Sequence, residues 1–182
     1  YRNNVTEKTS LTGNTINHLF KDSKNHFWIA TNQGLSKLNP STEWFQTFKN
    51  DLSNNKAYSS EVIKSFEDKK GNIWIISRRY LIKLGTQKKE YYLLDSLSFL
   101  FNENKNTPLY IAPDNTFWFG TAHGIKIFDP SKKTFLNQNN NPNYKNGYLF
   151  LGKRINCIYE DKLGIVWIAC NDGIIRYNPF SN

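Results

Sequence analysis

A fourfold internal repeat is the feature that most constrains how this chain can fold. Its copies read DSKNHFWIATNQGL, DKKGNIWIISRRYL, APDNTFWFGTAHGI and DKLGIVWIACNDGI, and their tryptophans, Trp28, Trp74, Trp118 and Trp167, lie 46, 44 and 49 residues apart. An aromatic residue precedes each tryptophan by eight positions, and Leu or Ile follows it by seven. A period in the forties built from short apolar segments is typical of β-propeller blades with about four strands each.

The first copy divides into four expected strands, from the innermost to the outermost strand of a blade: 16–20, 27–31, 35–38 and 43–48. A chain of 182 residues suffices for one domain with a sizeable core. We therefore predict an all-β fold of four-stranded antiparallel blades in a single propeller segment, with blades at about residues 14–49, 58–95, 106–137 and 154–179. Residues 1–13 are predicted to be the outer strand of a preceding or closing blade.

An acidic residue begins the turn before the tryptophan in three copies, at Asp22, Asp68 and Asp161. A Gly or Asn follows in each turn, and these residues tolerate positive φ. We expect the aspartates to cap the turns and the four tryptophans to pack between strands or blades, because catalytic residues do not normally recur in every repeat. His26 occupies a position that differs between copies, and we expect it to be exposed and without a role.

The loops between second and third strands vary while the hairpins repeat, and this predicts the ligand-binding face. They contribute amide, guanidinium, imidazole and carboxylate groups, which hydrogen-bond sugar hydroxyls or pair with an acidic sugar. The long connection after the third blade adds further candidates. The candidates for ligand binding are Arg78, Arg79, Tyr80, Asn32, Gln33, His123, Asn171, Asp172, Tyr144 and Arg154. The alternative is that these are only hydrated loops.

Composition removes several function classes. No apolar run is long enough to span a membrane, and no signal segment opens the chain. The chain begins at Tyr1 and contains no Met, so we expect an excised piece. Its 24 Lys and Arg against 15 Asp and Glu give a net charge of +9, dispersed as on an ordinary solvated surface. No nucleotide loop, kinase or DNA-binding motif occurs, and we predict no nucleic-acid partner and no cofactor.

The two cysteines and three histidines do not indicate a reactive centre. Cys157 and Cys170 fall on consecutive expected strands, where a disulfide directly across a hairpin would be strained, so two small buried thiols are expected. No Cys and His have metal-ligand spacing, which predicts no metal site. His18, His26 and His123 occupy different repeat positions and do not obviously converge, so no catalytic residue is assigned.

The sequences WIAT or WFGT, then GL or GI, then KLNP or IFDP, resemble the two-component regulator propeller repeat over about residues 14–179. The resemblance implies the periplasmic sensor region of a membrane-anchored hybrid two-component system that binds an oligosaccharide. The implied partners are the remaining blades and downstream signalling domains of the same polypeptide, and a homodimer is conceivable. Family propellers have about seven blades, so we favour a partial arc of a larger propeller over a closed four-bladed ring. A protein-binding scaffold and a polysaccharide lyase are the alternative functions.

Overall fold

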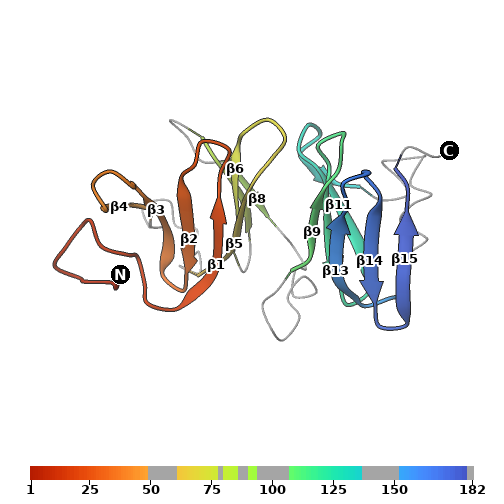
Figure 1. Cartoon of the computed structure of the whole chain (residues 1–182), viewed down its shortest axis with the longest axis horizontal. Coiled ribbons are helices and arrows are strands. Elements are labelled where there is room, and N and C mark those ends of the chain that lie inside the picture. Colours follow the sequence, from red (N-terminus) through yellow and green to blue (C-terminus); the bar gives the residue numbers. More distant parts are fainter. Residues whose placement is uncertain (49–60, 78–79, 86–89, 94–106, 137–151, 180–182) are drawn as a thin grey trace. The chain divides into compact units, whose positions relative to one another are not determined.

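The structure, a computed structural model, describes residues 1–48, 61–77, 80–85, 90–93, 107–136 and 152–179. Within these ranges the chain forms strands and turns only, arranged as four antiparallel sheets (Figure 1). No helix that could cross a membrane is found in the described part. The sheets belong to two compact units, Tyr1–Leu97 and Ser98–Asn182.

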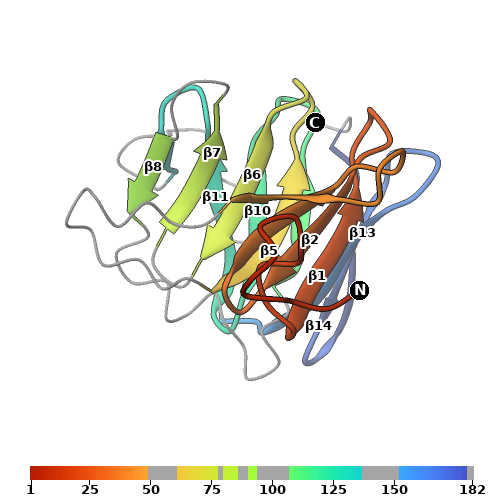
Figure 2. The ribbon, with the colours of Figure 1, turned by 90° about the vertical axis from the view of Figure 1, so that its left-hand side faces the viewer.

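The first unit contains two four-stranded sheets whose strands follow sequence order (Figure 2). The first comprises β1 (Ile16–Lys21), β2 (Phe27–Thr31), β3 (Gly34–Leu38) and β4 (Phe45–Phe48). The second comprises β5 (Val62–Glu67), β6 (Ile73–Ser77), β7 (Tyr80–Leu84) and β8 (Glu90–Leu93). These strands match the expected division of a blade, and β4 begins two residues later than expected because Glu43 lies in a turn at φ 57°.

The second unit contains the third and fourth sheets. The third comprises β9 (Leu109–Ile111), β10 (Phe117–Thr121), β11 (Gly124–Asp129) and β12 (Thr134–Phe135). The fourth comprises β13 (Ile155–Glu160), β14 (Val166–Cys170) and β15 (Gly173–Tyr177), three strands within the described residues. The predicted all-β class with antiparallel blades is therefore confirmed.

Residues 1–13 form turns here and not the predicted strand. The segment is held to the first sheet at two places. The Phe45 amide donates to the Thr9 carbonyl at 2.8 Å, and the buried Thr12 hydroxyl lies 3.0 Å from the hydroxyls of Thr31 and Ser36. These few contacts, one with the start of β4 and one with hydroxyl side chains of β2 and β3, stand where the predicted strand would have formed a ladder of backbone hydrogen bonds.

Consecutive blades pack through equivalent faces. In the first unit Trp28, Ala30 and Leu35 of one sheet pack against Val62, Ile75 and Ile82 of the next. In the second unit Tyr110, Trp118 and Ile125 pack against Ile155, Val166 and Ile168. Fully burying one such large apolar side chain contributes about 1.5–3 kcal/mol. Trp28 and Trp118 thus lie on the face that meets the following blade of their own unit.

Faces equivalent to these packed faces are exposed on the first sheet and on the fourth sheet. Tyr159, Trp167 and Ile174 of the fourth sheet are 62%, 39% and 72% exposed, although they correspond to the packed Phe20, Trp28 and Leu35. On the first sheet Ile16, Leu19 and Phe27 are exposed, whereas their counterparts Ile155, Ile158 and Val166 are packed. The expectation that all four tryptophans pack between strands or blades is not met at Trp167, which is 39% exposed and which no following sheet covers within the described residues.

We predict that the two tryptophans differ in their contribution to stability. Trp74 is 1% exposed, so Trp74→Ala should lower the free energy of unfolding by about 3–5 kcal/mol, as other large core truncations do. Trp167→Ala should cost clearly less, because the indole is already partly hydrated. Urea unfolding of the two variants measures both values, and equal losses would contradict the assignment of the packed face.

His18 on β1 generates a second prediction. Its Nδ1 is buried with no hydrogen-bond partner among the described residues, and burial together with the nearby Lys64 charge lowers its pKa to about 4. An unfolded histidine titrates at about 6.5, so between these values the unfolded chain binds a proton that the folded chain does not. The His18 contribution to stability is therefore complete above about pH 6.5 and is lost as the pH falls toward about 4.

His18→Gln should weaken this pH dependence, whereas His123→Gln, at an exposed position, should leave it unchanged. Urea unfolding at about pH 7.5 and about pH 4.5 provides the comparison. An identical fall in stability for the parent and the His18 variant would show that His18 is not the group responsible.

Candidate functional site

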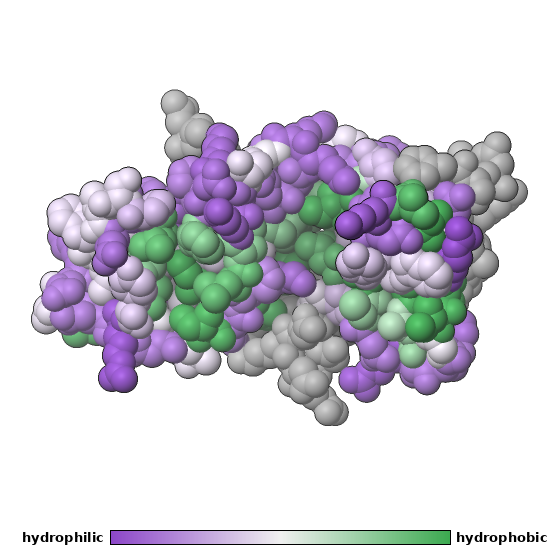
Figure 3. Space-filling view, viewed as in Figure 1, coloured by the Kyte–Doolittle hydropathy of each residue, from purple (hydrophilic) through white to green (hydrophobic). Residues whose placement is uncertain are grey.

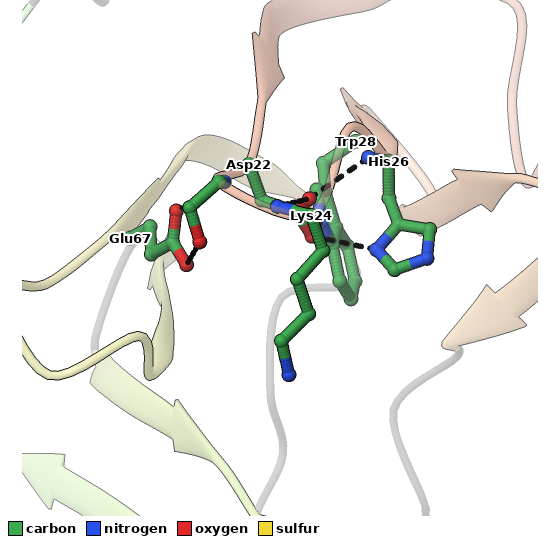
Figure 4. Close-up of polar contacts among 6 residues, drawn as sticks. Asp22, Lys24, His26, Trp28 and Glu67 are labelled. Carbon is green, nitrogen blue, oxygen red and sulfur yellow. Dashed lines mark hydrogen bonds and ion pairs between the residues drawn. The ribbon is translucent and has the colours of Figure 1, made fainter.

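The turn between β1 and β2 is organised by one carboxylate (Figure 4). Asp22 Oδ1 accepts hydrogen bonds from the amides of Lys24 at 3.0 Å and His26 at 2.8 Å. Asp22 Oδ2 accepts the indole N–H of Trp28 at 2.8 Å. The carboxylate therefore caps the turn and also joins it to the tryptophan that packs against the next blade.

This arrangement recurs. The Trp74 indole donates to Asp68 at 2.9 Å, and the Trp167 indole donates to Asp161 at 2.8 Å. Burial by itself would raise the pKa of Asp68, but the hydrogen bonds from Trp74 and Asn72 lower it below its usual value. These aspartates are therefore held ionised by the fold.

The third repeat, in which Ala112 replaces the aspartate, makes the same connection in two steps. The Trp118 indole donates to Thr116 Oγ1 at 3.1 Å, and this hydroxyl donates to Asp114 Oδ1 at 2.7 Å. A carboxylate two residues further along thus reaches the indole through a hydroxyl. The departure at Ala112 is compensated within the turn.

We predict that Thr116→Val destabilises the third blade. The variant leaves the buried indole N–H of Trp118 without its acceptor, which should cost about 1–3 kcal/mol. Thr47→Val on the edge strand β4 is the matched control and should change stability little. Chemical denaturation measures both, and equal effects would argue against the relay.

His26 differs from the expectation of an idle, exposed side chain. It is half-buried, and its Nδ1 lies 3.0 Å from Asp22 Oδ2. In the second blade the side-chain amide of Asn72 contacts Asp68 in the same way, at 2.9 and 3.0 Å. His and Asn thus make the same contact with the capping carboxylate in the first two blades.

At the opposite end of the first sheet, Asn32 and Gln33 form the turn between β2 and β3. Thr31 Oγ1 donates to the Gly34 carbonyl and accepts from the Gln33 amide. Asn32 is half-buried, and its backbone amide donates to the Thr15 carbonyl. A Cβ added at Gly13 would lie 2.5 Å from Asn32 Oδ1. Residues 12–15 thus pass close over Asn32, while Gln33 remains exposed.

Tyr80 begins β7 and is half-buried, packing against the apolar cluster between the first two blades. The glycines at the equivalent position, Gly34 and Gly124, have φ of 140° and 124°. A side chain at such a positive φ would be strained. Arg78, Arg79 and Tyr144 lie outside the described residues, and their binding roles stay predictions.

In the second unit, four of the predicted residues gather at one end of the sheets. The Gly152 amide donates to the His123 carbonyl at 3.2 Å, and the Asn171 amide donates to the Arg154 carbonyl at 3.1 Å. The Arg154 amide in turn donates to Asn171 Oδ1 at 3.1 Å. The side chains of His123, Arg154, Asn171 and Asp172 are all exposed, so this end presents an imidazole, a guanidinium, an amide and a carboxylate to solvent.

Lys153 neutralises the carboxylate in this group. Its ammonium contacts Asp172, and this hydrogen bond lowers the pKa of Asp172 and raises that of Lys153. Within the described residues Arg154 forms no ion pair. The cluster therefore offers a cation together with neutral hydrogen-bonding groups.

The cysteines are free thiols, as expected, but they are less buried than expected. A β-bulge between Ile155 and Cys157 shifts the register, so Cys157 pairs with Ala169 and Cys170 with Ile155. Both thiols are free. Cys157 is exposed and Cys170 is half-buried, with burial raising the pKa of the Cys170 thiol.

Sequence reasoning missed two sets of contacts at these turns. One is the direct bond from indole to carboxylate, which the constant spacing between Asp and Trp in three repeats could have indicated. The other is the hydroxyl that closes each turn between second and third strands, at Thr31, Ser77 and Thr121. The fourth repeat has Cys170 at this position.

Comparisons with known proteins agree with the geometry. The model of the two-component regulator propeller family matches residues 10–33 and 146–172, so the chain carries repeats of this type. Histidine kinase P4 of Formosa agariphila is 29% identical over 178 residues, which covers 71% of this chain and 13% of that protein.

Solved structures confirm the propeller fold. The extracellular domain of the putative hybrid two component system BT3049 from B. thetaiotaomicron matches with a TM-score of 0.70 and 19% identity. The match covers 98% of this chain and 22% of the BT3049 chain. The corresponding domain of BT4673 has a TM-score of 0.64 and 19% identity, covering 93% and 21%. Virginiamycin B lyase from Staphylococcus aureus has a TM-score of 0.55 and 13% identity, covering 96% and 57%. The chain therefore spans under a quarter of the signalling proteins that it resembles.

Proposed function

We propose that this chain is a run of blades from the extracytoplasmic sensor propeller of a hybrid two-component signalling protein, and that the propeller recognises an oligosaccharide without catalysing a reaction. The repeat type supports the class, as do relatives named as a histidine kinase and as extracellular domains of hybrid two component systems. A periplasmic location follows from the same proposal.

Exposed blade faces support a larger propeller. Trp167 with Tyr159, and Leu19 with Phe27, occupy repeat positions that are packed wherever another blade adjoins. Blades of a repeat protein bury their apolar faces against neighbours. Further blades of the same polypeptide are the proposed cover for these faces, with downstream signalling domains and a homodimer as the proposed remaining partners.

The loop end of the blades is the proposed ligand surface. In the second unit this end carries His123, Arg154, Asn171 and the Lys153–Asp172 pair. In the first unit, taken by itself, it carries Gln33. Such groups hydrogen-bond hydroxyls, and a guanidinium pairs bidentately with a carboxylate or sulfate. Arg78 and Arg79, at the one such turn where Tyr80 replaces Gly, are the proposed contacts for an acidic sugar.

Calorimetric titration with panels of neutral and acidic oligosaccharides tests this function. Arg78→Ala combined with Arg79→Ala should weaken binding of an acidic oligosaccharide by about 30-fold or more, since losing charge partners costs about 2–5 kcal/mol. Binding by the parent should also weaken as salt rises. Lys69→Ala with Lys70→Ala, at a hairpin on the opposite end of the same sheet, is the control and should bind as the parent does.

The alternatives give different results. A protein-binding scaffold would bind no member of either panel and would retain a protein from periplasmic extract. A polysaccharide lyase would produce new ultraviolet absorbance from unsaturated uronides. Unchanged affinity in the double arginine variant would leave these loops as solvated turns and would favour a neutral sugar or a protein.

A further inference from the structure

A second polar site lies at the hairpin end of the first blade, away from the loop end. A surface pocket of about 390 Å³ opens between the turn before β2, the end of β3 and the start of β4. Its polar lining consists chiefly of Lys24, His26, Lys37, Asn39, Ser41 and Gln46. No carboxylate lines it, so its ionisable lining groups are all bases.

Lys37 is positioned by the blade, and neither pocket lysine is neutralised by a neighbour in the described part of the chain. Lys37 Nζ lies 5.4 Å from the centre of the Trp28 ring, a cation–π contact that holds the ammonium at the edge of the blade. Among the described residues neither Lys24 nor Lys37 forms an ion pair. Figure 4 shows Lys24 and His26 extending from the same turn, away from Glu67.

The nearest carboxylates are already engaged. Both Asp22 oxygens accept hydrogen bonds from the turn and Trp28, and its side chain is only 4% exposed. Glu67 accepts from the amide and hydroxyl of Ser23 at 2.6 and 2.7 Å. These bonds pair neither carboxylate with Lys24 or Lys37, although Asp22 also contacts His26 Nδ1 at 3.0 Å.

Comparison of the repeats shows that the fold does not require this charge. The positions of Lys24 and Lys37 hold Asp114 and Ile127 in the third blade, and Leu163 and Arg176 in the fourth. The second blade keeps both lysines, as Lys70 and Lys83, but has Asn72 in place of His26. Two lysines with a histidine thus occur together in the first blade alone among the four repeats.

We infer that this pocket binds an oxyanion, a sulfate or carboxylate group, between the ammonium groups of Lys24 and Lys37, with Asn39, Ser41 and Gln46 as neutral hydrogen-bonding groups. Asp22 holds the His26 ring through Nδ1, which leaves Nε2 for the pocket. A protonated ring donates from both nitrogens, and then Nε2–H adds a third cationic donor. The inference goes beyond the sensing proposal and does not depend on it.

Protonation of His26 links anion binding to pH. Asp22 contacts its ring, Lys24 and Lys37 line the same pocket, and Glu67 is bonded to Ser23 of the same turn. A bound anion favours the protonated ring, so affinity should increase as the pH falls. Such coupling is absent from a pocket in which the histidine is only structural.

The test is a titration of the chain with inorganic sulfate and, separately, with glucuronate, followed by amide chemical shifts at constant ionic strength. Lys24→Gln with Lys37→Gln should raise the dissociation constant by about tenfold or more, the loss expected for about 1.4 kcal/mol of interaction. The matched control, Lys70→Gln with Lys83→Gln, removes the same two charges from the second blade and should bind as the parent does. Circular dichroism establishes that both variants fold.

His26→Asn places in the first blade the residue that the second blade uses to contact its aspartate. It should keep the turn intact and abolish the strengthening of binding at low pH. Tighter binding of glucuronate than of sulfate would support the site and assign it to an acidic sugar, and similar binding of both would support it as a general oxyanion site. Absence of shifts at residues 24–26 and 37–46 with either probe, or equal weakening by the second-blade control, would overturn the inference.

Discussion

The hydrogen bond from the tryptophan indole to a carboxylate in the preceding turn is the interaction on which each blade depends. A tryptophan can fill the space between blades only if its N–H finds a partner, because an unpaired buried donor is costly. The same carboxylate accepts amides of the turn, so one aspartate both closes the hairpin and satisfies the core. The Thr116–Asp114 relay in the third blade keeps this connection after the aspartate is lost.

The two ends of a blade are therefore stabilised by different hydrogen bonds. At the hairpin end the backbone is constrained by capping, and variation is confined to side chains that point outward, such as Lys24 and His26. At the loop end a Thr or Ser hydroxyl closes the turn in three blades, and the two residues within each turn are free to vary. Candidate ligand chemistry therefore lies at both ends, supported by different local bonds.

The exposed faces follow from the same repeat. Each blade has one face that receives the preceding blade and one that carries its own tryptophan toward the next. In each unit the two sheets pack together through one such pair of faces. The equivalent faces, which carry Leu19 and Phe27 on the first sheet and Tyr159 and Trp167 on the fourth, remain exposed. A repeat of this kind specifies how blades join but not how many there are.

The sequence by itself determined the four repeats within this chain, the order of the strands in the first blade and the turn positions. These are local properties, carried by apolar segments of strand length and by Asp, Asn and Gly at the turns. Only the tertiary structure decided which side chains the blades bury: Trp28 is covered and Trp167 is not, although their sequence contexts match. It also revealed the turns of residues 1–13, the contact of His26 with Asp22, and the bulge that separates Cys157 from Cys170. Burial depends on blades distant in the chain, and a local pattern does not encode it. The contact of His26 with Asp22 is local, but its position holds a different residue in every repeat, so the pattern does not mark it.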